Sequence, residues 1–326
     1  DAKNGSQNTV LPIALATGNC ELRTECTVAW ILTDDKGHAR GVTYIDANGR
    51  WQEQLADIVV VSGCAIESAR LLLNSKGRLF PKGLGNRYDQ VGRHLQGHHY
   101  TGAIGYFDFE TYDDVGPGAS IAVTDYNHGT PGLCGGGMLA NEFIRLPIHM
   151  VDRVPKDTPR WGLGHKQAMR AWHKRSIVIM GPTQQIPTAT GRVTIDEAVR
   201  DKWGLPVARF EGNVHPHTFA IGDLQAKRAE AWLKEAGAIH TELMASHPTR
   251  VSAGQHQAGT CRMGDDPHGS VVNKVCQVHD ADNVFVIDSS VHVTNGGFNP
   301  ALTIMALAYY ASDALVHNWK GTQFRT

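Results

Sequence analysis

Hydrophobic and polar residues alternate through much of residues 8–62, which is the pattern of half-buried β-strands. Two breaks in this pattern, at residues 34–37 and 46–49, end in glycine, which adopts positive φ readily. Such breaks are typical of hairpin loops. The sequence therefore predicts antiparallel strands joined by tight turns in this region.

A continuous β-branched run at residues 58–61 predicts a strand buried on both faces. It ends at Ser62-Gly63, and residues 65–75 then show the spacing of an amphipathic helix. Strand, small residues and helix in this order are the local shape of a nucleotide-binding α/β fold.

The stretch from residue 76 to 250 is richer in Gly and Pro, and its strands look short. Residues 175–187, 191–197 and 206–212 have the pattern of antiparallel strands, and residues 218–238 that of an amphipathic helix. We interpret this stretch as a second domain built on an antiparallel sheet with flanking helices.

After residue 250 the α/β pattern returns, with a buried strand that ends at Asp288. A helix is expected to start near Asn299, with Pro300 in its first turn, where a missing N–H costs nothing. The helix is apolar on all sides, which predicts that it is buried. The fold class expected is therefore mixed α/β, with residues 1–75 and 251–326 in one domain and 76–250 in the other.

Composition and charge argue against nucleic-acid binding, a membrane span and a metal site. The formal net charge is −1, so there is no electrostatic case for nucleic acid. No apolar run reaches the roughly 20 residues of a membrane span. The six cysteines include no CxxC pair, so no metal site is expected from this chain.

Two segments carry the candidate chemistry. His256 precedes the small-residue turn Ala258-Gly259-Thr260, and Asn299 stands at a helix N-terminus after a Gly-Gly pair. A histidine beside an electron-accepting group can take the proton of a hydroxyl while hydride leaves its carbon. Either motif alone is more often structural, as a buried histidine or a helix cap. Their combination, with Asp288 between them, favours a catalytic site.

These motifs resemble the glucose–methanol–choline (GMC) oxidoreductases. The family has a His followed, after two residues, by Gly-Thr-Cys-x-Met-Gly, here from His256 to Gly264. Next come Asp-x-Ser, here residues 288–290, and Asn-Pro before a Thr-containing helix, here residues 299–303. The resemblance covers about residues 8–105 and 250–318 and is strongest to large subunits of bacterial FAD-dependent gluconate, glucose and glucoside 3-dehydrogenases.

The resemblance implies a role for each matched residue. His256 would be the base, and Asn299 would hold the substrate hydroxyl and the flavin edge. The implied FAD contacts are Val28 at the adenine, Ser62 and Gly63 near the dinucleotide, Asp288 and Ser289 near the ribityl chain, and Asn299, Pro300 and Thr303 near the flavin ring.

The implied reaction is FAD-dependent oxidation of a sugar hydroxyl to a ketone or lactone. The alternatives are an alcohol oxidase that uses oxygen on a non-sugar alcohol, and a non-catalytic fragment or binding module. Candidate substrate residues are Gln184, Gln185 and His98, for each of which a structural role is the alternative.

The family's N-terminal G-x-G-x-x-G loop does not occur in this sequence. We therefore expect FAD to be shared with an N-terminal companion chain or fragment. The resemblance is compatible with an iron–sulfur cluster in that segment, with a small subunit or cytochrome as electron acceptor, and with a bacterial periplasm or cytoplasm as the location.

Overall fold

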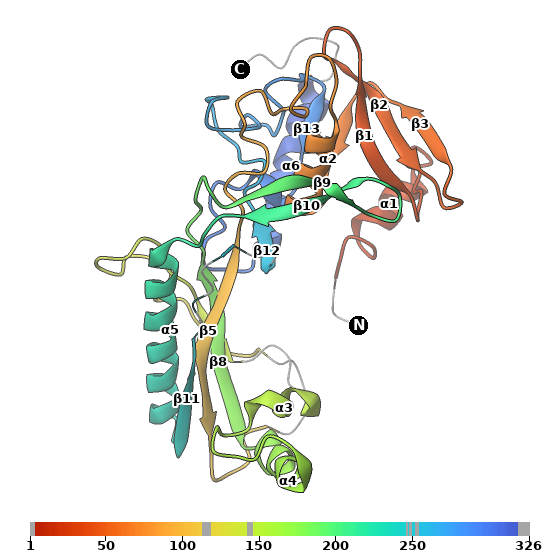
Figure 1. Cartoon of the computed structure of the whole chain (residues 1–326). Helices are drawn as coiled ribbons and strands as arrows, with labels where there is room; N and C mark the ends of the chain where they lie inside the picture. The colour runs from red at the N-terminus through yellow and green to blue at the C-terminus, as the bar shows by residue number, and fades with distance from the viewer. Residues whose placement is uncertain are drawn as a thin grey trace.

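The computed structural model describes residues 4–112, 119–141, 146–245, 247, 250–251 and 254–318. Figure 1 shows two parts joined by the long strand β5, Gln96–Tyr106. One part holds the small sheet β1–β3 together with α2, α6 and β13, and the other holds β8, β11 and α5. Mixed α/β architecture with antiparallel sheets is confirmed.

The first part contains a three-stranded antiparallel sheet in the order β1-β2-β3. Both predicted hairpin turns are present, because the N–H of Gly37 donates to Asp34 O and that of Gly49 to Asp46 O. The expectation of strand from residue 8 is wrong at its start, where a short helix, α1, lies exposed on the surface. The elements are α1, Val10–Ala16; β1, Thr27–Thr33; β2, Ala39–Ile45; and β3, Trp51–Leu55.

A parallel strand pair lies beside this sheet. β4, Val59–Val61, pairs in parallel with β13, Val284–Val286, and β4 leads into the helix α2, Cys64–Asn74. Side chains from all three elements belong to the largest buried apolar cluster. The predicted order of strand, turn and helix is therefore confirmed, and it is completed by a strand from the far end of the chain.

The second part is built on a six-stranded sheet in the order β11-β5-β8-β7-β6, with β12 also paired to β5. β5 and β8 run antiparallel from the pair His98–Gln184 to the pair Tyr106–Ser176. The helix α5 covers one face, where Leu233 packs with Ala103. The elements are β6, Ala122–Val123; β7, Leu139–Asn141; η1, Pro147–His149; α3, Met150–Arg153; α4, Gly162–His173; β8, Ser176–Gln184; α5, Pro216–Glu235; β11, His240–Met244; and β12, Gln255–Ala258.

A two-stranded ribbon, β9 (Arg192–Arg200) and β10 (Pro206–Glu211), packs on α2. Nε of Arg70 in α2 donates to Pro206 O at 2.8 Å, and Val193 belongs to the same buried cluster as β4 and β13. Part of the stretch 76–250 thus contributes to the first core. The domain limits drawn from the sequence stay predictions.

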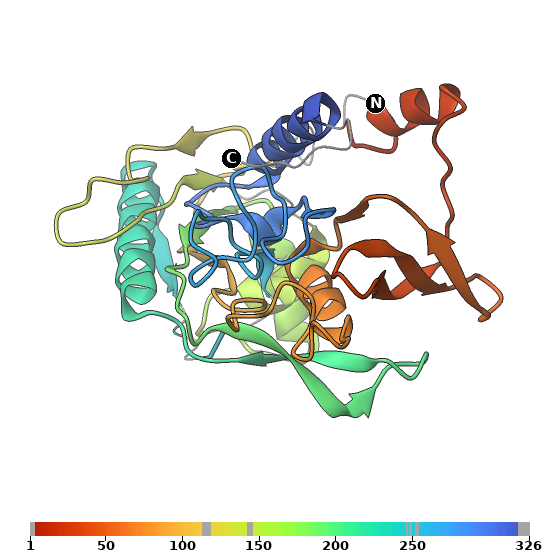
Figure 2. The same cartoon turned by 90° about the horizontal axis from the view of Figure 1, so that it is seen from above.

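The prediction that the last helix is buried is wrong. In α6, Ala301–Asn318, Ala311 is buried, while Leu302 is 81% and Tyr309 70% exposed. The helix packs on the core along one stripe, and no described residue covers its remaining apolar side chains; Figure 2 shows it projecting from the body of the molecule. In the described part of the chain, no helix is long and apolar enough to cross a membrane.

Candidate active site

His256 lies in an irregular strand pair where the two parts of the molecule meet. In β12, Gln255 pairs with His98 and Ala258 with Gln96, and the register shifts between them. His256 has a φ of 60°, in the left-handed region that non-glycine residues rarely adopt. Such strain persists only where the surrounding structure enforces it, and it is common at functional sites.

The imidazole of His256 contacts the imidazole of His98. Their Nδ1 atoms are 2.8 Å apart, and the ring planes are inclined by 76°. Nε2 of His98 lies 3.0 Å from the carbonyl oxygen of Gly296. The structure therefore brings together two of the histidines singled out from the sequence, through strands β5 and β12 and the loop before α6.

Burial keeps both rings neutral. It lowers the pKa of His98 to about 4, against the opposing effect of the hydrogen bond to Gly296, and it lowers the pKa of the half-buried His256. A neutral imidazole can accept a proton, so His256 is in the form that a general base requires at neutral pH.

Asn295, which sequence reasoning missed, fixes this arrangement. Its Nδ2 donates to the carbonyl oxygen of His256 at 2.6 Å, and its N–H donates to Oε1 of Gln96 at 2.9 Å. Asn295 is buried, and it ties the strained backbone of His256 to β5. The signal available in the sequence is its position just before the Gly-Gly pair, between the two motifs.

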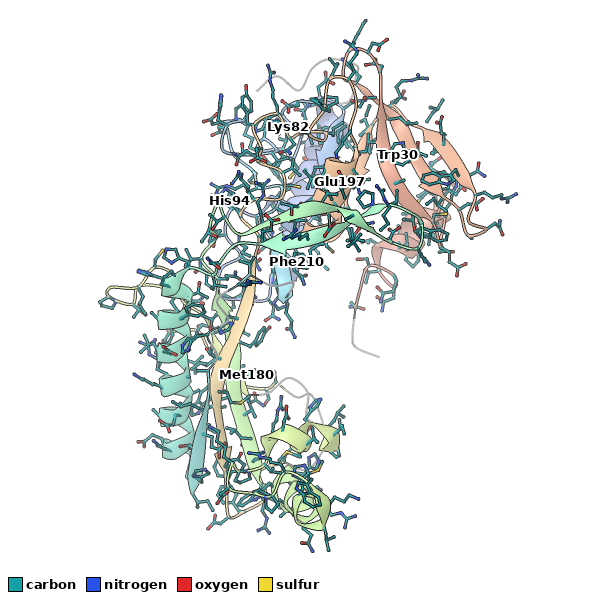
Figure 3. All side chains as sticks on the ribbon, viewed as in Figure 1. Trp30, Lys82, His94, Met180, Glu197 and Phe210 are labelled. Carbon is teal, nitrogen blue, oxygen red and sulfur yellow. The ribbon has the colours of Figure 1, made fainter. Side chains whose placement is uncertain are left out.

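Gly259 allows the turn after His256 to close against the chain. Its φ is 90°, and a Cβ there would lie 2.3 Å from the carbonyl oxygen of His94. Figure 3 marks His94, which comes just before β5 at the junction of the two parts. Because Gly259 has no side chain, the turn after His256 can lie directly against the backbone of His94.

Asn299 stands at the start of α6, three residues after Gly296. Asn299 and Thr303 are exposed, whereas Pro300 is buried and its carbonyl accepts from the N–H of Ile304. The loop that contacts His98 and His256 therefore leads directly into the N-terminus of this helix.

The candidate substrate glutamines flank His98. Oε1 of Gln185 accepts from the N–H of Gly97 at 2.9 Å, and Nε2 of Gln184 donates to Oγ1 of Thr294 at 2.7 Å. Gln185 is buried and Gln184 half-buried. Both glutamines lie near the histidine pair, and both hydrogen-bond to residues next to it in β5 or in the loop before α6. Contact with substrate stays a prediction for each.

Three of the residues expected to hold a dinucleotide lie around the end of β4, which pairs in parallel with β13. Val28, Ser62 and Gly63 line one cleft of about 350 Å³, and Gly63 is the N-cap of α2. A helix N-terminus beside parallel strand ends is suited to a phosphate or dinucleotide. These residues fit one side of an FAD site.

Asp288 and Ser289 follow directly after β13. The carboxylate of Asp288 accepts from Oγ of Ser68 at 2.5 Å and from the N–H of Ser290 at 2.7 Å. A carboxylate has about four acceptor positions, so two remain for a hydroxyl of a ligand. In the described residues, no group of three His, Cys, Asp or Glu is arranged to hold a metal ion.

Comparison with known proteins agrees with this geometry. Two family models, both described as GMC oxidoreductase, match residues 1–100 and 187–308, together more than half of the chain. The chain belongs to the GMC oxidoreductase family. Enzymes of the GMC family bind FAD.

Relatives of the chain are oxidoreductases. It is 34% identical over 322 residues to 2-methyl-1,2-propanediol dehydrogenase of Mycolicibacterium austroafricanum, covering 93% of this chain and 55% of the relative. It is 28% identical over 328 residues to the gluconate 2-dehydrogenase flavoprotein of Pantoea cypripedii, covering 94% and 52%. The fold is similar to that of pyridoxine 4-oxidase from Mesorbium loti, with a TM-score of 0.57 at 16% identity over 90% of this chain and 57% of that one. The chain spans about half the length of the curated relatives it matches.

Proposed function

We propose that this chain carries the substrate-oxidising site of an FAD-dependent GMC oxidoreductase that converts a hydroxyl of a sugar or other polyol to a ketone or lactone. The observation that carries the proposal is the neutral, half-buried His256, held at the junction of the two parts and beside the loop that leads into α6. Family membership and the cleft between β1, β4 and α2 support it.

His256 would take the hydroxyl proton on the ring nitrogen that does not face His98. FAD, when bound, would accept the hydride that leaves the carbinol carbon. Asn299 would orient the hydroxyl from the start of α6. The substrate thus loses one proton to the protein and one hydride to the cofactor, which balances a two-electron oxidation.

The residues that would hold FAD come from three places in the fold. β1 and the β4–α2 turn would face the adenine side, and the segment after β13 and the start of α6 would face the ribityl chain and the ring. They are Val28, Ser62, Gly63, Asp288, Ser289, Asn299, Pro300 and Thr303.

A polyol substrate is supported by the names of two relatives. 2-Methyl-1,2-propanediol and gluconate both carry hydroxyls on neighbouring carbons. Gln184 and Gln185, which lie beside His98 and Gly97, would offer polar groups to additional hydroxyls. We infer a substrate with at least two adjacent hydroxyl groups.

We further propose that a companion segment, in the same chain or a separate one, completes the FAD site and covers α6. The exposed apolar side chains of α6, including Leu302, Met305 and Tyr309, support this, because scattered single apolar residues are normal on a surface but a helix exposing many of them is not. An iron–sulfur cluster would belong to that segment, and a small subunit or cytochrome would take the electrons.

The experiment is anaerobic addition of polyols to the flavin-loaded protein that contains this chain. We expect vicinal polyols such as gluconate or 1,2-propanediol to bleach the visible flavin absorbance. Hydrogen peroxide measured in air then separates an oxidase from a dehydrogenase, and we expect little peroxide. A flavin band that persists with every polyol but is bleached by a simple monoalcohol would overturn the polyol assignment.

A further inference from the structure

His98 is too enclosed to be a good substrate contact. It is 6% exposed, and both of its ring nitrogens are engaged within the protein, one by His256 and one by Gly296. A side chain in this position acts on its neighbours.

The carbonyl oxygen of Gly296 determines which nitrogen of His98 carries the proton. A carbonyl can only accept, so Nε2 of His98, 3.0 Å away, must donate to it. A buried ring whose pKa is lowered to about 4 carries one proton at neutral pH, so Nδ1 of His98 has a lone pair.

The proton between the two rings must then belong to His256. The Nδ1 atoms are 2.8 Å apart, a hydrogen-bond distance that requires one hydrogen between them. Since Nδ1 of His98 accepts, Nδ1 of His256 donates. A neutral His256 therefore has its lone pair on Nε2, and no residue in the described part of the chain hydrogen-bonds to that atom.

We propose that His98 is a positioning residue. Its hydrogen bonds to the carbonyl oxygen of Gly296 and to Nδ1 of His256 fix His256 as the Nδ1–H tautomer. They leave Nε2 of His256 free to take the proton of the substrate hydroxyl. This inference deepens the proposed function and rests on it for the substrate. The same contact supports the imidazolium after proton transfer, because its Nδ1–H keeps an acceptor.

The surrounding contacts hold this arrangement in place. Asn295 binds the backbone carbonyl of His256, and its own N–H is bound by Gln96, two residues before His98 on β5. The same loop thus provides both the hydrogen bond to the His256 backbone and the Gly296 carbonyl that orients His98. Both rings are fixed from a single segment.

Three variants of the flavin-loaded protein test the proposal. His98→Leu removes the acceptor at Nδ1. His98→Asn retains one, because the amide oxygen of Asn occupies about the position of Nδ1. His165→Leu is the matched control, since His165 is also buried and has Nδ1 2.9 Å from a backbone carbonyl, that of Pro159, but lies in α4.

The tautomer of His256 is measured by nitrogen-15 NMR of histidine-labelled protein at neutral pH, with the signal assigned by its loss in His256→Gln. We expect the Nδ1–H form in the wild type, His98→Asn and His165→Leu, and a substantial Nε2–H population in His98→Leu. An Nε2–H form in the wild type, or an unchanged tautomer in His98→Leu, would overturn the proposal.

Flavin reduction by the polyol gives the second readout. We expect His98→Leu to slow it by about 10-fold or more, yet by less than the ~10²–10⁴-fold cost of removing the base itself, with recovery in His98→Asn. A wild-type flavin that no alcohol reduces contradicts the proposed function, whereas the NMR result still decides the role of His98. Equal reduction rates in all three variants would contradict that role.

Discussion

At the residue scale, the site depends on a backbone that is held in an unfavourable conformation. His256 sits at a positive φ within an irregular strand pair, and Asn295 binds its carbonyl oxygen. Burial lowers the pKa of the ring, so the neutral base persists below the pH at which an ordinary histidine becomes protonated. The strained backbone and the lowered pKa therefore belong to the same residue, His256.

The sequence identified some of these residues but not others. His256 and Asn299 stand in motifs with characteristic spacing, so both could be singled out from the chain alone. The roles of Asn295 and Gln96 depend on contacts between segments far apart in the sequence, which spacing does not encode. The same is true of the contact between His98 and His256.

At the scale of elements, local signals predicted structure where turn chemistry and periodicity agreed. The hairpins of β1–β3 and the helices α2, α5 and α6 were predicted close to their observed positions. Residues 10–16 were misassigned because a short apolar run has no periodicity that separates helix from strand. The burial of α6 was misjudged because what covers a helix depends on the tertiary structure.

The β9–β10 ribbon is tied to the loop before β5 by an ion-pair network around Asp89. Its carboxylate lies 2.8 Å from Nη2 of Arg192 in β9 and also contacts Arg93. Arg192 above all, and Arg93, lower the pKa of Asp89 to about 2. The carboxylate is 44% exposed, so its contribution to stability is modest.

Asp89→Asn removes the charge while keeping a residue that tolerates the φ of 57° found there. We expect the free energy of unfolding to fall by about 1 kcal/mol at neutral pH. Because the folded-state pKa is lowered, the stabilisation is present above the unfolded pKa of about 4 and is lost as pH falls towards 2. The difference between variant and wild type should therefore shrink over that window in urea unfolding.

Asp35→Asn is the control, since that carboxylate is 99% exposed and 3.7 Å from its nearest cation, Arg78. It should leave stability unchanged at every pH. An Asp89→Asn effect that does not change between pH 4 and pH 2 would show that the charge is not responsible.

At the scale of the whole molecule, β5 joins the two parts, and the histidine pair lies where they meet. The proposed proton acceptor therefore lies at the junction of the two parts. The helix α6, whose exposed apolar side chains no described residue covers, begins at the same junction. We therefore expect the proposed companion segment to complete the FAD site and to cover α6 at the same time.

The variant Leu302→Lys tests whether the proposed companion segment binds to α6. Leu302 is 81% exposed in this chain, so the change should leave the folding of the chain itself intact. Co-expressed with the part of the 2-methyl-1,2-propanediol dehydrogenase that this chain does not match, the wild-type chain should co-purify with that part and with flavin. The variant should lose both.

Leu163→Lys in α4, 72% exposed, is the matched control and should retain the companion and the flavin. Equal co-purification of the wild type and the Leu302 variant would contradict an interface on α6.

The central claim is that His256 takes the substrate proton, and the most direct test is the rate of flavin reduction under anaerobic conditions. His256→Gln should slow this rate by roughly 10²–10⁴-fold while flavin content stays the same, because the base is lost and the FAD cleft is untouched. His165→Gln, which removes another buried histidine far from the junction, should reduce flavin at the wild-type rate. A His256→Gln protein that reduces its flavin at close to the wild-type rate would contradict the account.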